Sequence, residues 1–168
     1  MLLAICKYWE YGWHRQKEGH MTLVQDKPTV ATNIATIKQW VNDMAKGNLD
    51  NAPYAEDAEI SDPNGKYKGK TQILQSFNVW KTAFPKATGE VTNQIAMGDQ
   101  VTSEIVVKST HTGPLVSPTG TIPPTNKPIE LKVMQVTSFR NGLIQRERSY
   151  YDQGDFLRQL GVSLPAKP

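Results

Sequence analysis

Two long segments in the second half of this chain alternate between apolar and polar side chains, and that period of two constrains the fold more than any other feature. It predicts strands with one face buried and the other exposed. Asn141-Gly142 follows the second segment and predicts a tight hairpin turn into a third strand, residues 143–151. The inward-facing side chains are expected to be Val101, Ser103, Ile105, Val107, Ser109 and His111 in the first strand, and Ile129, Leu131, Val133, Gln135, Thr137 and Phe139 in the second.

Hydrophobic spacing of three and four residues predicts helices before and after these strands. One is expected over residues 29–46 and another over residues 73–84, where Pro85 ends it. A short third helix is predicted after Asp152, which suits an N-cap, and it ends at Gly161, which suits a C-cap. Early helices followed by consecutive strands indicate an α+β domain, in which a curved antiparallel sheet wraps around the N-terminal helices.

The segment EISDPNG, residues 59–65, interrupts an earlier alternating run. Ala58 and Ile60 share one side of the expected strand, and Asp62 comes next on that same side. Its carboxylate either accepts hydrogen bonds from the backbone of the following turn or acts as a general base in a pocket. Spacing alone leaves both interpretations open, because general-base chemistry also needs partly apolar surroundings.

Three more polar side chains fall on inward faces. Gln135 lies among apolar neighbours and needs a partner there, which is either a ligand or a structural group such as Ser149 or a water. Glu147 either faces a cavity as a second acid or forms a salt bridge with a neighbouring arginine. His111 ends its strand where a loop begins, so its imidazole either serves as an acid or base or is simply solvated at the rim.

The segment between the two long strands, residues 112–128, is rich in proline and glycine. Those residues do not sustain ladder pairing, so the segment is expected to be a long unpaired loop. Loops of this length in compact domains are often functional covers. We therefore expect this loop to influence specificity.

The chain length of 168 residues suits one domain with a real core, assigned to residues 28–164 with a tail at 165–168. Residues 1–27 are interpreted as an N-terminal extension that is either not native or poorly ordered, with Met21 as an alternative start. The competing interpretation is an added strand or helix that packs its tryptophans on the domain.

Charge and cysteine content restrict the partners. The net charge of +3 is scattered along the chain, so a nucleic acid is not an expected partner. The apolar run over residues 1–6 is too short for a signal peptide or a membrane span. A single cysteine suits a reducing compartment, and a cytoplasmic location is expected. Neither metal-ligand spacing nor a nucleotide-binding fingerprint occurs, so no metal and no cofactor are expected.

Three local motifs resemble the SnoaL-like polyketide cyclase branch of the nuclear transport factor 2-like superfamily. They are YAEDAEISDPNGKYKGKTQI, STHTG with the later IPPTNKPIEL, and NGLIQRERSYYDQGDFLRQLGV. Together they reach from about residue 29 to residue 164. The resemblance implies a cone-shaped sheet, the cystatin-like α+β barrel, which encloses a deep apolar pocket. The side chains expected to line that pocket are Phe77, Val133, Ser149 and Tyr151.

The resemblance also implies site residues. The related ketosteroid isomerases keep their catalytic base in an EDP-x-G motif, and Asp62 occupies that position in SDPNG. Their oxyanion hole uses a Tyr where Trp40 stands and an Asp where Gln135 stands, so the N–H groups of Trp40 and Gln135 become the expected donors. In the SnoaL-like cyclases, the proton-abstracting Asp corresponds to Ser149 and the assisting His corresponds to Gln135.

These residues together predict a cofactor-independent enzyme, of polyketide cyclase or ketosteroid isomerase type, that transfers protons on a small apolar carbonyl or aromatic compound. The alternative is a non-catalytic domain of the same fold that binds a small molecule or another protein. Outward Met134 and Val136 predict a homodimer formed through the outer sheet face. The candidate catalytic residues are Asp62, Gln135, Trp40, His111 and Glu147.

Overall fold

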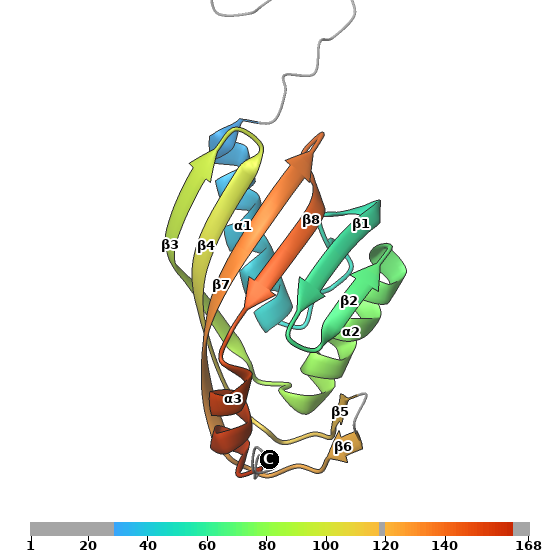
Figure 1. Cartoon of the computed structure of the whole chain (residues 1–168), viewed down its shortest axis with the longest axis vertical. Coiled ribbons are helices and arrows are strands. Elements are labelled where there is room, and N and C mark those ends of the chain that lie inside the picture. The colour runs from blue at the N-terminus through green and yellow to red at the C-terminus, as the bar shows by residue number, and fades with distance from the viewer. Residues whose placement is uncertain (1–28, 118–119, 163–168) are drawn as a thin grey trace, which may run out of the picture.

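Six strands form one curved sheet, and two helices cover one of its faces (Figure 1). The computed structural model describes residues 29–117 and 120–162. The expectations for residues 1–27 and 165–168 lie outside these described residues. Within the described part, the predicted α+β class is confirmed.

The first helix, α1 (Val30–Ala45), matches the helix predicted from hydrophobic spacing. It begins at Thr29, whose hydroxyl oxygen accepts a hydrogen bond of 3.2 Å from the backbone N–H of Thr32. One stripe of the helix packs toward the sheet. The side chains buried in that stripe are Asn33, Ile37, Trp40 and Val41.

The interrupted segment forms a hairpin. Its strands are β1 (Tyr54–Asp62) and β2 (Gly65–Lys68), which turn at Pro63-Asn64. The second helix, α2 (Lys70–Ala83), begins directly after the hairpin and ends before Pro85, as predicted. The hairpin therefore carries the chain from the sheet to the helix layer within a few residues.

The other strands of the sheet are β3 (Thr88–Met97), β4 (Gln100–Thr110), β7 (Pro128–Arg140) and β8 (Leu143–Tyr150). Their order is β2-β1-β8-β7-β4-β3. β1 and β8 pair in parallel and all other neighbours pair antiparallel, so the sheet is mixed rather than antiparallel throughout. Two strands joined by a tight hairpin must pair antiparallel. β1 and β8 are separated in the sequence by most of the domain, so no hairpin fixes their relative direction and parallel pairing is possible.

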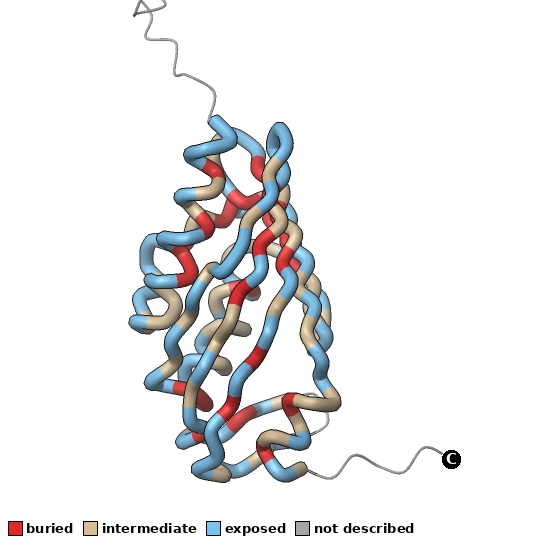
Figure 2. The backbone as a smooth tube through the Cα atoms, turned by 90° about the vertical axis from the view of Figure 1, so that its left-hand side faces the viewer, coloured by how far each residue is buried: buried red, intermediate tan, exposed pale blue. Residues whose placement is uncertain are grey.

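The inward faces predicted for β4 and β7 are buried or half-buried, as expected. In β8 the inward side chains change from even-numbered to odd-numbered positions along the strand. Near the turn Ile144 is fully buried and Leu143 is 44% exposed, whereas further along Glu147 is buried. The register between β7 and β8 shifts between Ser138 and Phe139, and such an irregularity reverses which side chains face inward. Figure 2 shows the helix layer beside the sheet, with many of the buried residues where the two face each other.

Residues 112–117 and 120–127 form an arm that is partly paired, rather than the unpaired loop that was expected. It contains a short hairpin of β5 (Leu115–Ser117) and β6 (Gly120–Ile122). Pairing is possible there because Pro114 and Pro123 flank the paired residues instead of lying among them.

The chain ends its described part in α3 (Gln153–Leu160), and both predicted caps are confirmed. The Asp152 carboxylate accepts a hydrogen bond of 2.7 Å from the backbone N–H of Asp155. Gly161 has the left-handed conformation, with a φ of 76°. None of the helices in the described residues is long and apolar enough to cross a membrane.

Candidate functional site

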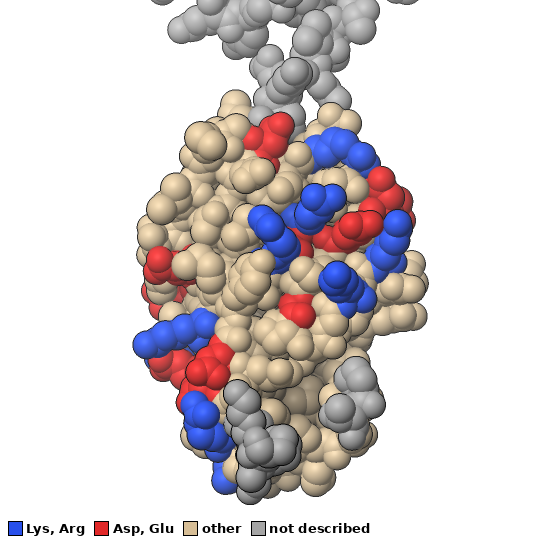
Figure 3. Space-filling view, viewed as in Figure 1, with Lys and Arg blue, Asp and Glu red and all other residues tan. Residues whose placement is uncertain are grey.

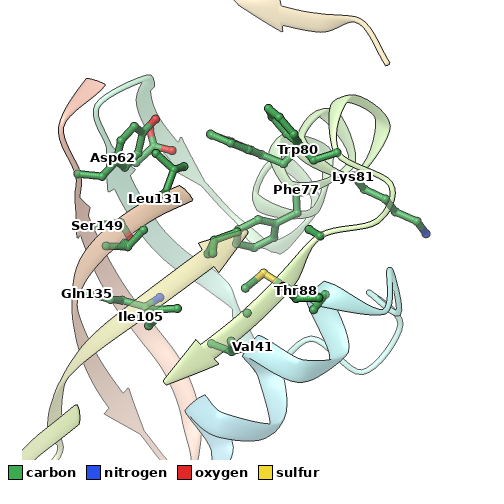
Figure 4. Close-up of a pocket in the computed structure, with 18 of the residues that line it drawn as sticks. Val41, Asp62, Phe77, Trp80, Lys81, Thr88, Ile105, Leu131, Gln135 and Ser149 are labelled. Carbon is green, nitrogen blue, oxygen red and sulfur yellow. The ribbon is translucent and has the colours of Figure 1, made fainter. Parts of the chain in front are cut away.

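An apolar cavity of about 200 Å³ lies between the sheet and the two helices (Figure 4). Apolar walls come from both helices and from the central strands, as with Val41, Phe77 and Leu131. Polar side chains also line the cavity. Besides Lys81 and Thr88, five of them come from the adjacent strands β1, β7 and β8 and from the residue that follows β8. This polar cluster consists of Asp62, Gln135, Glu147, Ser149 and Tyr151.

Strand register explains why the cluster forms. Gln135 lies opposite Ser149, and Glu147 lies opposite Thr137 on one side and Ile60 on the other. Inward side chains of neighbouring strands therefore stand in rows across the sheet. The four residues predicted to line the pocket, Phe77, Val133, Ser149 and Tyr151, all lie on the cavity wall.

Glu147 is one of the two most deeply buried members of the cluster, with 4% of its surface exposed. The hydroxyl of Tyr54 donates to its Oε2 at 2.6 Å, and the hydroxyl of Ser149 donates to its Oε1 at 3.2 Å. Burial raises the pKa of Glu147, and hydrogen bonds from Tyr54, Gln135 and Ser149 partly oppose that rise. Among the described residues no arginine pairs with it, so the salt-bridge interpretation is wrong.

Tyr54 and Trp40 form a chain of hydrogen bonds that ends at Glu147. The indole N–H of Trp40 donates to the Tyr54 hydroxyl oxygen at 3.2 Å, and both side chains are buried. Burial and the charge of Glu147 raise the pKa of Tyr54 well above its ordinary value. Trp40 is not on the cavity wall, so its N–H group serves Tyr54 and does not reach a ligand directly. Sequence reasoning missed Tyr54, and the available signal was its place on the same side as Ala58 and Ile60.

Asp62 forms the turn that its spacing allowed and also lies on the cavity wall. Its Oδ1 accepts backbone hydrogen bonds from Asn64 at 2.8 Å and from Gly65 at 2.9 Å, which is an Asx-type turn. The same side chain is half-buried and lines the cavity (Figure 4). Its charge contributes to raising the pKa values of Tyr151 and Tyr67, for which burial is the larger cause.

Gln135 is 4% exposed and stands beside Ser149 on the sheet side of the cavity (Figure 4). Its amide oxygen is buried without a hydrogen-bond partner in the described residues. Its amide nitrogen donates a hydrogen bond to Glu147. Figure 4 shows that nitrogen on the side toward the cavity, so the second N–H of the amide offers a donor to a ligand. The predicted position among apolar neighbours, Leu131 and Val133, matches the structure.

His111 is fully buried and is not among the residues that line the cavity. Its Nδ1 accepts a hydrogen bond of 3.3 Å from the backbone N–H of Thr125, and its ring lies 5.2 Å from that of Phe84. The arm folds over the imidazole, so the expected rim position is wrong. Burial lowers the pKa of His111, and a hydrogen bond with the Gly113 backbone partly offsets that effect.

The site holds oxygen-rich side chains, but they do not form a metal centre. Within residues 29–117 and 120–162, no group of three or more His, Cys, Asp or Glu side chains is arranged to hold a metal ion.

Comparison with protein families gives a match over most of the domain. The family model described as SnoaL-like polyketide cyclase matches residues 35–160. No curated protein matches this chain in sequence. The match includes α1 from residue 35 onward, α2, the whole sheet and α3, so all the residues that line the cavity lie within it.

Solved structures share the fold at low sequence identity. A candidate SnoaL-like polyketide cyclase from Jannaschia sp. CCS1 is 16% identical, with a TM-score of 0.70 over 84% of this chain and 96% of that one. The candidate hydroxylase AclR from Streptomyces galilaeus is 19% identical, with a TM-score of 0.67 over 83% and 87%. The candidate polyketide cyclase IdmH from Streptomyces antibioticus is 25% identical, with a TM-score of 0.61 over 80% and 99%.

Proposed function

Because the chain belongs to the SnoaL-like polyketide cyclase family, we propose that it is a cofactor-independent enzyme that moves protons on a small apolar carbonyl compound. The reaction would be of the cyclase or isomerase type. The observation that carries the proposal is the presence of two carboxyl groups, Asp62 and Glu147, on the wall of an otherwise largely apolar cavity. Carboxyl groups in such surroundings are suited to general acid and base catalysis.

Asp62 is assigned the role of general base. Two backbone N–H groups hold its Oδ1, while no group in the described residues donates to its Oδ2. Oδ2 is therefore available to take a proton from the carbon next to a ligand carbonyl. The electron pair of that C–H bond forms the C=C bond of an enolate, and the carbonyl electron pair moves onto oxygen.

Gln135 and Glu147 are assigned to the enolate oxygen. The Gln135 N–H group donates a hydrogen bond, and Glu147, whose pKa is raised by burial, donates a hydrogen bond in its protonated form. In an isomerisation, Asp62 returns the proton to a different carbon. In a cyclisation, the enolate carbon attacks a second carbonyl carbon, and the alkoxide that results takes up the proton that Asp62 removed.

Deuterium exchange tests the assignment of Asp62. The wild-type protein is expected to exchange the α or γ hydrogens of at least one enolisable ketone in a steroid and polyketide-like panel in D₂O. Asp62→Asn should abolish that exchange without loss of stability, since the amide oxygen of Asn can accept the same two backbone hydrogen bonds. If a folded Asp62→Asn protein still exchanges the ketone hydrogens, Asp62 is not the general base.

Glu147→Gln tests the second carboxyl. Gln remains a neutral donor, so part of the exchange rate should persist. The wild-type rate should decline as the pH rises through the raised pKa of Glu147, and the variant should lack this decline. A folded Glu147→Gln protein with no exchange at any pH would indicate that Glu147, rather than Asp62, is the base.

A non-catalytic binding domain is the second candidate. It is favoured by Gln135 and Ser149, which stand where the resemblance implies the His and Asp of the cyclases. This function predicts that an apolar ketone binds equally well to the wild-type protein and to Asp62→Asn. It also predicts that neither protein exchanges any ketone of the panel.

A homodimer through the outer sheet face is part of the proposal. Met134 and Tyr150 lie opposite each other on β7 and β8, and they are 40% and 55% exposed. Figure 3 shows this side of the molecule, where charged side chains of both signs lie around uncharged surface. Sedimentation analysis should find a dimer in the wild type and a monomer in the Met134→Lys, Tyr150→Lys double variant. A monomeric wild type would contradict the dimer.

A further inference from the structure

Polar side chains form a row across the inward face of the sheet. Strand pairing places Gln94 of β3 opposite Ser103 of β4, Ser103 opposite Gln135 of β7, and Gln135 opposite Ser149 of β8. An inward sheet face beneath helices ordinarily carries apolar side chains. This polar row, Gln94, Ser103, Gln135 and Ser149, therefore requires a reason beyond packing.

The middle of the row is closed to bulk water and is held from the helix side. Ser103 is fully buried. The amide nitrogen of Gln94 donates to the Ser103 hydroxyl oxygen at 3.1 Å and to the backbone oxygen of Ile34 in α1 at 3.5 Å. Gln94 is thus anchored to α1 and fixes the Ser103 oxygen as an acceptor.

The Ser103 hydroxyl proton then has to point toward another acceptor. The neighbour across the ladder is Gln135. Its amide nitrogen donates to Glu147, whereas its amide oxygen is buried and has no partner in the described part of the chain. Buried polar atoms are normally paired with protein groups or with an ordered water. A small side-chain rotation, or one bridging water, would join the Ser103 hydroxyl to the Gln135 oxygen.

We infer that Gln94 and Ser103 are positioning residues that hold the Gln135 amide with its nitrogen, not its oxygen, toward the ligand. The inference rests on the proposed function, in which this N–H group stabilises an enolate oxygen. An amide turned by half a rotation would present an acceptor, which repels an oxyanion and favours a ligand hydroxyl instead. The row thus selects a carbonyl or enolate oxygen at this point of the cavity.

Nuclear magnetic resonance of the Gln135 side-chain amide tests the inference without any substrate. The resonance is assigned by its absence from Gln135→Met. In the wild type we expect one pair of N–H signals with slow hydrogen exchange. In Ser103→Ala the pair should shift and exchange at least about tenfold faster, because the amide oxygen loses its donor. Unchanged signals and exchange in Ser103→Ala would overturn the inference.

Ser109→Ala is the matched control. It removes a hydroxyl from the same strand and the same face, and that hydroxyl lies opposite Ile129 instead of Gln135. Its Gln135 signals should remain those of the wild type. Gln94→Met provides a second variant if Ser103→Ala fails to fold, since it removes the donor one step further along the row.

Kinetics then separate positioning from ligand binding. For a ketone that the wild type exchanges, Ser103→Ala should lower kcat about tenfold with KM nearly unchanged, because the lost interaction forms only with the enolate. Ser109→Ala should change neither constant. If the wild type exchanges no ketone, the proposed function fails while the resonance test still decides the orientation. If ketone exchange occurs but the Gln135 amide signals are the same in Ser103→Ala as in the wild type, the inference alone fails.

Discussion

Tyr54 and Glu147 are 93 residues apart in the sequence and share a hydrogen bond of 2.6 Å in the interior. Trp40 donates to the same Tyr54 oxygen at 3.2 Å, so three buried side chains from α1, β1 and β8 form one chain of hydrogen bonds. That chain ends at a carboxyl group on the cavity wall. The hydrogen bonding of the Glu147 carboxyl group therefore depends on residues of α1 and β1 as well as on its own strand.

Replacing Tyr54 with Phe should raise the pKa of Glu147 further. Burial is the main cause of its raised pKa, and the Tyr54 hydrogen bond acts in the opposite direction by favouring the ionised form. Loss of the hydroxyl leaves the effect of burial less opposed. The measurement is a pH titration of the Glu147 carboxyl carbon by nuclear magnetic resonance.

Tyr150→Phe is the control for that titration, because it removes a phenol hydroxyl from the exposed outer face of the same strand. The pKa of Glu147 measured in Tyr150→Phe should equal that of the wild type. A Tyr54→Phe protein in which Glu147 titrates as in the wild type, or at lower pH, would contradict the hydrogen-bond chain.

Asp62 should show separate effects on stability and on activity. Asp62→Ala removes the acceptor for the backbone N–H groups of Asn64 and Gly65, whereas Asp62→Asn retains one. We expect Asp62→Ala to be less stable than Asp62→Asn by about 1–2 kcal/mol in urea unfolding. Both variants should lack ketone exchange. Equal stability of the two would mean that the turn does not depend on this acceptor.

Period-two alternation was enough to predict the inward faces of β4 and β7, because one face of each strand is buried along most of its length. It was not enough for β3, an edge strand in which no residue is buried. A strand without a buried face carries little hydrophobic pattern, and β3 was not predicted from the sequence.

The site was only partly predictable for a related reason. Asp62 and Gln135 were found because each interrupts a local pattern of apolar side chains, and Glu147 was found because its place in the alternation predicts an inward side chain. Tyr54 was missed because its importance comes from Glu147, which reaches it through the parallel pairing of β1 and β8. The local pattern places Tyr54 on the same side as Ala58 and Ile60, but pairing between strands so distant in the sequence leaves no local signal of its partner.

Stability should depend on His111 as the pH falls. Its Nδ1 accepts a backbone hydrogen bond from Thr125, and its pKa is lowered by burial, so the neutral imidazole is the form that fits the fold. The unfolded chain binds the proton more readily, and the stabilisation is complete above the ordinary pKa of about 6.5. It is lost as the pH falls from that value toward the lowered pKa of the folded protein.

Urea unfolding at about pH 7.5 and about pH 5 measures this dependence. The wild type should lose more free energy of unfolding between the two values than His111→Gln does, since Gln carries no titrating group. An equal or larger loss in His111→Gln would show that protonation of His111 does not destabilise the fold.

The arm should be sensitive to a single methyl group at Gly113. The backbone N–H groups of Thr112 and Gly113 both donate to the Ala83 oxygen at 3.1 Å, which ties the arm to the end of α2. A Cβ at Gly113 would lie 2.0 Å from the backbone oxygen of Thr82, and a backbone atom cannot rotate away as a side chain can. Gly113→Ala should therefore reduce the free energy of unfolding by about 1–3 kcal/mol.

Gly65→Ala is the comparison, because a Cβ there would meet only the Tyr67 ring and hydroxyl at 3.8 Å or more. It should unfold at nearly the same urea concentration as the wild type. The arm also covers His111, which contacts the cavity residue Phe84. Displacement of the arm in Gly113→Ala should therefore weaken binding of an apolar ligand as well as stability. Wild-type stability in Gly113→Ala would show that the arm is not held by this close backbone contact.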